Sequence, residues 1–144
     1  MQKIIPHLWF DKAAVEAAEF YASTFENSKI TSKTTIHDTP SDDCDIVGFQ
    51  IMGFDFMAIS AGPIFKINPS ISFSLNLKTK EEVQMLWDKL SPDGQVLMEL
   101  QKYPFSDFYG WLNDKFGVSW QLIVLGEKLQ NRPKVTPALM FTKN

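Results

Sequence analysis

Histidine and cysteine are scarce in this sequence, which has two histidines, His7 and His37, and one cysteine, Cys44, among 144 residues. A structural zinc site of the cysteine and histidine type needs four ligands, so these three side chains cannot complete one. A single cysteine also excludes a disulfide within the chain. The lone thiol agrees with a reducing compartment, and we expect a cytoplasmic protein.

A basic surface and a long apolar segment are lacking as well. The formal net charge is −3, and the 14 lysines and arginines are scattered along the chain, so nucleic-acid binding has no electrostatic support. No stretch approaches the length of a membrane span, and the N-terminus has no apolar core of a signal peptide. We therefore expect neither a nucleic-acid partner nor a membrane.

Aromatic residues, by contrast, are abundant, with 12 phenylalanines and 4 tryptophans. Such side chains belong in a core, a pocket or an interface, because an exposed aromatic patch promotes association. The length is that of a single compact domain with a sizeable core.

The first half of the chain predicts a strand, a helix and three strands. Asp11 is a plausible N-cap for an amphipathic helix, and Gly53 separates the last two strands. The polar residues between the second and third strands, which include Pro40, predict a loop. The expected ranges are strand 3–10, helix 13–25, strand 29–37, loop 38–45, and strands 46–52 and 54–61.

The same order returns in the second half. Thr79 is the expected N-cap of the second helix, and Gly117, 64 residues after Gly53, marks the second hairpin. The expected ranges are strand 70–77, helix 79–90, strand 95–100, aromatic loop 103–108, and strands 110–113 and 118–125. We predict an α+β fold of two βαβββ modules, at about 1–62 and 68–127, within a single domain at 1–130.

A shorter repeat lies at the C-terminus. Pro6, Leu8 and Phe10 recur as Pro137, Leu139 and Phe141, each 131 residues later. The tail at 131–144 thus resembles the first strand of a further repeat. This pattern indicates a second domain in the natural gene or a strand that serves a partner chain; the alternative is coincidence in a short apolar pentapeptide.

Several of these segments together resemble the PhnB-like branch of the glyoxalase and bleomycin-resistance superfamily, also called the vicinal oxygen chelate superfamily. They span Lys3 to about Leu125 and comprise Pro6–Asp11, Ala17–Tyr21, Phe25–Ile30, Ala61–Pro63, Ser70–Phe73 and, most specifically, Gly110–Gln121. Members of this branch often carry the label 3-demethylubiquinone 3-methyltransferase. The resemblance implies mixed, curled sheets with a helix on the convex side and a ligand cavity on the concave side.

On that fold, strand alternation would turn Phe56 and Trp120 toward a helix, and Met57 and Gln121 toward the cavity. The superfamily's metal ligands would fall on His7 or Ile5, on Met57, on one of Ser70, Ser72 and Ser74, and on Gln121. This set holds no anionic ligand for a hard divalent cation, so we predict no metal centre and no cofactor.

Methyl transfer, which the label names, lacks support from the residues. A methyl donor such as S-adenosylmethionine is usually held by a glycine-rich turn after a strand, and the seven glycines form no such cluster. We therefore disfavour a true methyltransferase.

His7 is the best catalytic candidate, because imidazole titrates near neutrality and its strand position would aim it into the cavity. The alternative is a polar residue hydrogen-bonded at a strand end or a dimer seam. The pocket candidates share small hydroxyl, amide or apolar side chains suited to orienting a small ligand, and they are Trp9, Met57, Ser60, Ser72, Ser74, Trp111 and Gln121. Alternatively, Ser72 and Ser74 merely face solvent.

Three functions remain in competition. The first is a metal-free protein that binds a small organic molecule, with catalysis through His7 left open. The second is a non-catalytic dimerising or structural half of a tandem-domain protein. The third is a divalent-metal-dependent lyase or dioxygenase with other ligands. We expect a small-molecule ligand and a homodimer, because the aromatic-rich chain has apolar surface to spare.

Overall fold

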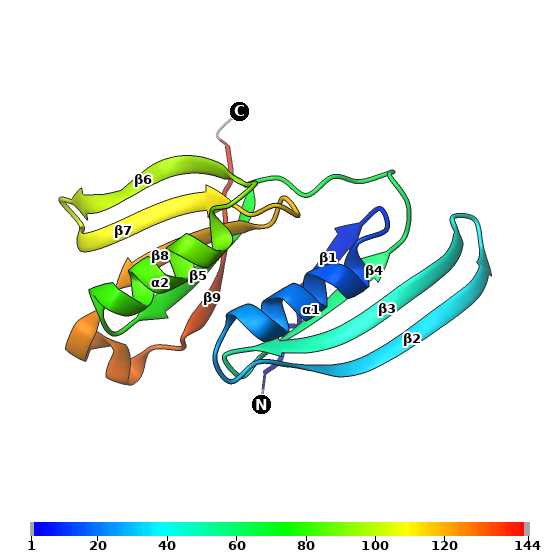
Figure 1. The fold of residues 1–144 in the computed structure, drawn as a ribbon, viewed down its shortest axis with the longest axis horizontal. Coiled ribbons are helices and arrows are strands. Elements are labelled where there is room, and N and C mark those ends of the chain that lie inside the picture. Colours follow the sequence, from blue (N-terminus) through cyan, green and yellow to red (C-terminus); the bar gives the residue numbers. More distant parts are fainter. Residues whose placement is uncertain (1, 143–144) are drawn as a thin grey trace. The chain divides into compact units, whose positions relative to one another are not determined.

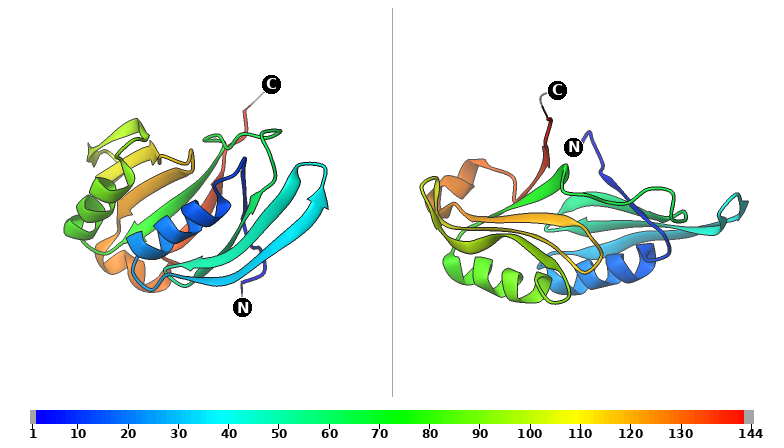
Figure 2. Two further views of the ribbon diagram at one scale, coloured as in Figure 1. Left: turned by 45° about the vertical axis from the view of Figure 1, so that its right-hand side comes forward. Right: turned by 90° about the horizontal axis from the view of Figure 1, so that it is seen from above.

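The computed structural model describes residues 2–142, which form two compact units with their boundary between Ile67 and Asn68. Each unit contains a strand, a helix and three strands in chain order, and the second unit adds a 3-10 helix and one strand (Figure 1). The right-hand view of Figure 2 shows each helix lying against one face of its own sheet. The predicted α+β architecture of two βαβββ modules is therefore confirmed. No helix in the described part of the chain is long and apolar enough to cross a bilayer.

The first unit is a four-stranded mixed sheet with one helix. Its strand order is β1-β4-β3-β2, in which β1 and β4 are parallel and the other neighbours are antiparallel. The elements are β1 (His7–Phe10), α1 (Ala14–Thr24), β2 (Lys29–Thr39), β3 (Asp42–Ile51) and β4 (Phe54–Ser60).

The core of this unit lies between α1 and the sheet. Tyr21 of α1 stacks on Phe49 of β3 with ring centroids 5.9 Å apart, and Phe49 stacks on Phe56 of β4 at 5.4 Å. All three side chains are buried. Because strand side chains alternate, Phe56 and its strand neighbours of the same parity face α1, whereas Met57 faces the other side of the sheet.

Two local expectations in the first unit are wrong. The N-cap of α1 is Ala13 and not Asp11, and no side chain at that position caps the helix. The N–H of Ala14, which has no partner within the helix, instead donates to Oγ of Ser60, 3.0 Å away at the end of β4.

The segment predicted as a loop at 38–45 is mostly strand, because β2 runs to Thr39 and β3 starts at Asp42. The side chains of β2 are almost all exposed at the sheet edge, so their polarity reflects solvent contact and not a loop.

The second unit is a five-stranded sheet with the order β6-β7-β8-β5-β9. The aromatic loop predicted at 103–108 is a short turn, because the strands on both sides extend into it. The elements are β5 (Ile71–Leu77), α2 (Lys80–Leu90), β6 (Gln95–Tyr103), β7 (Ser106–Asn113), β8 (Ser119–Val124), the 3-10 helix η1 (Gly126–Asn131) and β9 (Val135–Leu139).

Helix α2 starts as the sequence predicts. Oγ1 of Thr79 accepts a hydrogen bond from the N–H of Glu82, and the Glu82 carboxylate accepts one from the N–H of Thr79, which completes a capping box. The helix packs Trp87 so closely on β7 that a Cβ at Gly110 would overlap the indole ring. Glycine at position 110 therefore permits the contact between helix and sheet.

Strand β9 gives the C-terminal Pro-x-Leu motif a different role from its N-terminal counterpart. β1 is parallel to β4, whereas β9 is antiparallel to β5. Leu8 is 5% exposed beneath α1, but Leu139 is 59% exposed. The two segments have similar residues but pack differently. A further repeat beyond the tail stays a prediction.

Candidate functional site

The face of the second sheet opposite α2 carries three adjacent rows of polar and aromatic side chains. Trp120 and Leu122 of β8 are fully buried on the other face, with the core, so Gln121 between them points away from α2. The strand register places Gln121 in the middle one of three rows that run across β7, β8, β5 and β9 in that order. The middle row is Trp111, Gln121, Ser74 and Thr136. One flanking row is Asn113, Ser119, Ser72 and Ala138, and the other is Tyr109, Ile123 and Asn76.

Gln121 is held at both ends of its carboxamide. The hydroxyl of Tyr109 donates to Oε1 of Gln121 at 2.6 Å, and Nε2 of Gln121 donates to Oγ of Ser72 at 2.8 Å. Ser72 is fully buried and Tyr109 nearly so, whereas Gln121 keeps partial access to solvent. Burial, together with the nearby Tyr103, raises the pKa of Tyr109 above its ordinary value of 10.0, so the phenol keeps its proton and can donate at neutral pH.

Trp111, Ser74 and Asn76 on this face also make hydrogen bonds. Nε1 of Trp111 donates to Oγ of Ser119 at 2.7 Å, which fixes the indole beside Gln121. The hydroxyl of Ser74 donates to Oδ1 of Asn76 at 3.3 Å, and Nδ2 of Asn76 donates to the carbonyl of Pro133 at 2.7 Å. These bonds attach the segment before β9 to the same face of the sheet.

One acceptor on this face is unsatisfied. Oδ1 of Asn113 is buried and has no hydrogen-bond partner within residues 2–142. It lies in the same row as the hydroxyls of Ser119 and Ser72. A buried amide oxygen without a donor is unfavourable, so Asn113 lowers the stability of this end of the sheet.

The candidates of the first unit lie on both faces of its sheet. His7 and Met57 are register partners on β1 and β4, and both point away from α1. Trp9 has the same orientation; its Nε1 donates to the carbonyl of Gly62 at 2.9 Å, and its ring meets Phe65 edge to face at 5.0 Å. Ser60 faces α1 and accepts the hydrogen bond from Ala14 described above.

The structure thus brings Ser72, Ser74, Trp111 and Gln121 onto one face of the second sheet. His7, Trp9 and Met57 share the helix-free face of the first sheet, and Ser60 lies on the helix-covered face.

Four residues of this site were not among the candidates predicted from the sequence, namely Tyr109, Asn113, Ser119 and Asn76. A signal for three of them was available. Positions 109, 111 and 113 alternate along one strand, and Ser119 alternates with Gln121, so extending the predicted strand 110–113 by one residue would have grouped them.

The donor set does not fit the metal centre that the superfamily implies. The residue at the β8 ligand position is Gln121, whose carboxamide is neutral, and the corresponding residue on β4 is Met57, a thioether. Within residues 2–142, no three His, Cys, Asp or Glu side chains gather at one place. A hard divalent cation prefers anionic oxygen ligands, which this face does not supply.

Among the described residues, a glycine-rich cradle for a methyl donor is not formed either. Gly53, Gly62, Gly117 and Gly126 adopt positive φ singly, and both α-helices begin after other residues, Ala13 and Thr79. The chain's own residues therefore do not fit the usual binding mode of S-adenosylmethionine.

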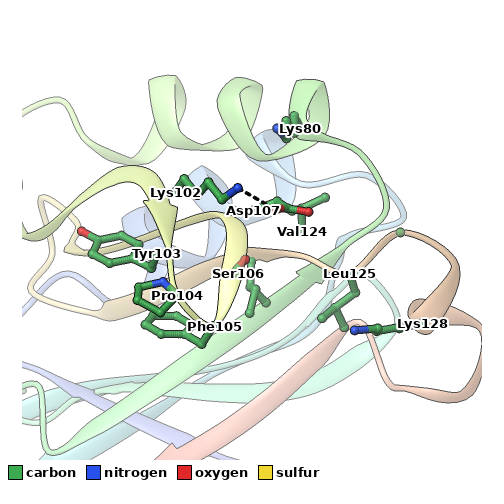
Figure 3. Close-up of a pocket in the computed structure, with 12 residues that line it drawn as sticks. Lys80, Lys102, Tyr103, Pro104, Phe105, Ser106, Asp107, Val124, Leu125 and Lys128 are labelled. Carbon is green, nitrogen blue, oxygen red and sulfur yellow. Dashed lines mark ion pairs between the residues drawn. The ribbon is translucent and has the colours of Figure 1, made fainter.

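The second unit also has an open pocket of about 550 Å³, but it is not centred on Gln121. It lies between the β6–β7 turn, the start of α2 and the end of β8 (Figure 3). Of the polar face it includes only Ile123, two residues along β8 from Gln121.

Comparisons with known proteins agree with this architecture. The model of the family described as 3-demethylubiquinone-9 3-methyltransferase matches residues 2–123. A solved PhnB protein of Bacillus cereus, described with the same activity, is 38% identical over 86% of this chain and 100% of its own, with a TM-score of 0.79. No curated protein is significantly similar in sequence.

More distant structures share the fold. A fosfomycin resistance protein of Listeria monocytogenes is 12% identical over 89% of this chain and 98% of its own, with a TM-score of 0.64. A glyoxalase-related enzyme of Fulvimarina pelagi is 16% identical over 86% of this chain and 89% of its own, with a TM-score of 0.55.

Proposed function

The chain belongs to the 3-demethylubiquinone-9 3-methyltransferase family of the glyoxalase superfamily, and on that premise we propose that it binds a small organic molecule without a metal ion. The ligand lies on the helix-free face of the second sheet. The observation that carries this proposal is the fixed carboxamide of Gln121.

A primary amide has two N–H donors and two acceptor lone pairs on oxygen. Tyr109 uses one lone pair of Gln121 and Ser72 uses one N–H, so one donor and one acceptor remain side by side. A ligand with a donor next to an acceptor matches this pair. Because Tyr109 and Ser72 already hold the carboxamide, little side-chain entropy is lost on binding.

This donor and acceptor pair indicates a substrate class. A planar ring with a hydroxyl next to a carbonyl presents the complementary pair, and the family description names a quinone, which is a ring with carbonyl groups. The indole of Trp111 lies in the neighbouring register position and provides an apolar contact for the ring. His7 is exposed on β1 of the first unit, and a catalytic role for it stays a prediction.

The first test uses benzamide, a planar fragment with a donor beside an acceptor, and N,N-dimethylbenzamide, which keeps only the acceptor. In the ¹⁵N-labelled protein we expect benzamide to shift the side-chain amide resonance of Gln121, and the dimethyl analogue to shift it far less. Gln121→Met should weaken benzamide binding about fivefold or more, because two hydrogen bonds are lost. Gln84→Met, on the exposed side of α2, is the matched control. Equal binding of the two fragments, or equal loss in both variants, contradicts the proposal.

A second candidate function, homodimerisation, is favoured by exposed apolar residues at one end of the second sheet. Ile71 and Leu139 are exposed register partners on β5 and β9, and Met140 and Phe141 follow them. We propose that a second copy of the chain covers these side chains. Light scattering should give twice the chain mass of 16.4 kDa, and Leu139→Asp should reduce it to one chain mass. A native chain that stays at one chain mass at micromolar concentration contradicts this.

A further inference from the structure

The pocket at the β6–β7 turn is a separate site from the polar face around Gln121, and it has a different chemistry. We propose that it binds a small organic anion, a carboxylate or similar monoanion carried on an apolar body. Its volume of about 550 Å³ lies within the range of small-molecule sites. The inference goes beyond the proposed function, because Gln121 does not line this pocket.

Positive charge dominates the rim of the pocket. Lys80, Lys102 and Lys128 line it from three different segments, α2, β6 and η1, and Asp107 is its one acidic lining residue. Figure 3 shows the three lysines and the contact between Lys102 and Asp107. That pair is 3.7 Å apart with side chains 79% and 73% exposed, so it holds the lysine weakly. Two positive charges remain in excess, in a chain whose net charge is −3.

Aromatic and aliphatic side chains form the wall of the pocket. Phe105 is 62% exposed at the turn, so much of its ring is accessible to a ligand. Its ring stacks on Tyr103 with centroids 5.4 Å apart and meets Tyr109 edge to face at 5.0 Å, so it is held in place by both neighbours. Leu125, after β8, adds aliphatic surface. A ligand with an apolar body can bury Phe105 in a way that an inorganic ion cannot.

The positive charge comes from the lysines and not from the start of α2. The capping box pairs the N–H groups of Thr79 and Glu82, and the Glu82 carboxylate also accepts from the N–H of Lys78. The helix end therefore has fewer free donors and a negative charge nearby. Nζ of Lys80 lies 6.0 Å from the ring centre of Phe108 on β7, at the outer limit of a cation–π contact.

The first experiment compares benzoate with benzamide, its neutral analogue of the same shape, by ¹⁵N NMR of the whole chain. Benzoate should shift the backbone resonances of residues 102–107 and 123–128 in a saturable way. Benzamide should shift them at least about fivefold more weakly, and 0.5 M salt should weaken the benzoate effect. The Gln121 side-chain resonance reports on the other site, so failure at one site is distinguishable from failure at the other.

The second experiment locates the charge. Lys80→Gln and Lys128→Gln should each weaken benzoate binding about threefold, whereas Lys89→Gln, an exposed lysine in the last turn of α2, should leave it unchanged. Phe105→Ala should weaken benzoate binding but leave the weaker binding of inorganic phosphate unaffected. Equal shifts of the resonances of residues 102–107 and 123–128 by benzoate and benzamide, equal effects of all three lysine variants, or phosphate binding there as tight as that of benzoate would each overturn the proposal.

Discussion

Asp114 stabilises the turn between β7 and β8, and replacing it tests how much of the second unit depends on one buried carboxylate. The side chain is 3% exposed. Oδ1 accepts hydrogen bonds from the N–H groups of Phe116 at 2.8 Å and Val118 at 3.1 Å, and Oδ2 accepts from Nε1 of Trp120 at 2.8 Å. The substitution Asp114→Ala removes all of these acceptors at once.

The expected loss follows from the donors that stay behind. A hydrogen bond to a charged group contributes about 1.5–3 kcal/mol, and a buried donor left without a partner costs about 1–3 kcal/mol. Water can replace part of the lost hydrogen bonding in a turn. We therefore expect the free energy of unfolding to fall by about 3–5 kcal/mol for the two backbone N–H groups and the one indole N–H together. For a chain of this size that loss lowers the Tm by about 10 °C or more.

Urea unfolding followed by circular dichroism measures the change. Asp11→Ala is the matched control, since Asp11 is exposed and does not cap α1, and its effect should be below about 0.5 kcal/mol. Combining Asp114→Ala with Trp120→Phe should give a coupling of about 1 kcal/mol or more, because both changes remove the same hydrogen bond. A loss below about 1 kcal/mol for Asp114→Ala, or strictly additive variants, would refute this reasoning.

Three further substitutions probe other contacts. Ser60→Ala removes the acceptor for the N–H of Ala14 and should lower the free energy of unfolding by about 1 kcal/mol in urea titrations. Gly110→Ala forces a Cβ into the indole of Trp87 and should cost about 2 kcal/mol or more in the same measurement. Burial raises the pKa of Tyr109 above 10.0, so the unfolded chain loses that proton first and stability falls as the pH rises from 10 through the folded-state pKa. Tyr109→Phe should flatten this alkaline decline in thermal melts recorded between pH 9 and about 11.

The order of elements was predictable from the sequence because local signals specify it. Thr79 and Glu82 form the capping box that their spacing in the sequence predicts. In both halves of the chain, the spacing of apolar residues in the helices differs clearly from that in the strands. The predicted ends of strands were wrong where the residues are polar enough to fit either a strand or a loop. Thr39 and Asp42 lie on an exposed edge hairpin, and polar residues in such a hairpin look like a loop when only the sequence is available.

For the site, the alternation of side chains along a strand predicts which face of the sheet a residue lies on, but not which residues it contacts. Gln121 was placed opposite Trp120 by its position in the strand, and the structure agrees with that placement. Its partner Tyr109 depends on the register between β7 and β8, which is a property of the folded sheet. Ser60 shows the same limit, because its hydroxyl is committed to a helix that starts 46 positions earlier in the chain.

Strand β9 determines how the second sheet ends. Without it, β5 would present seven residues of unpaired backbone, and such an edge recruits extended segments of other molecules. With it, the outermost strand is only five residues long and contains Pro137, which has no N–H to donate. The C-terminal segment therefore limits the addition of a further strand at this edge of the sheet, where exposed side chains such as Leu139 are left to contact other molecules.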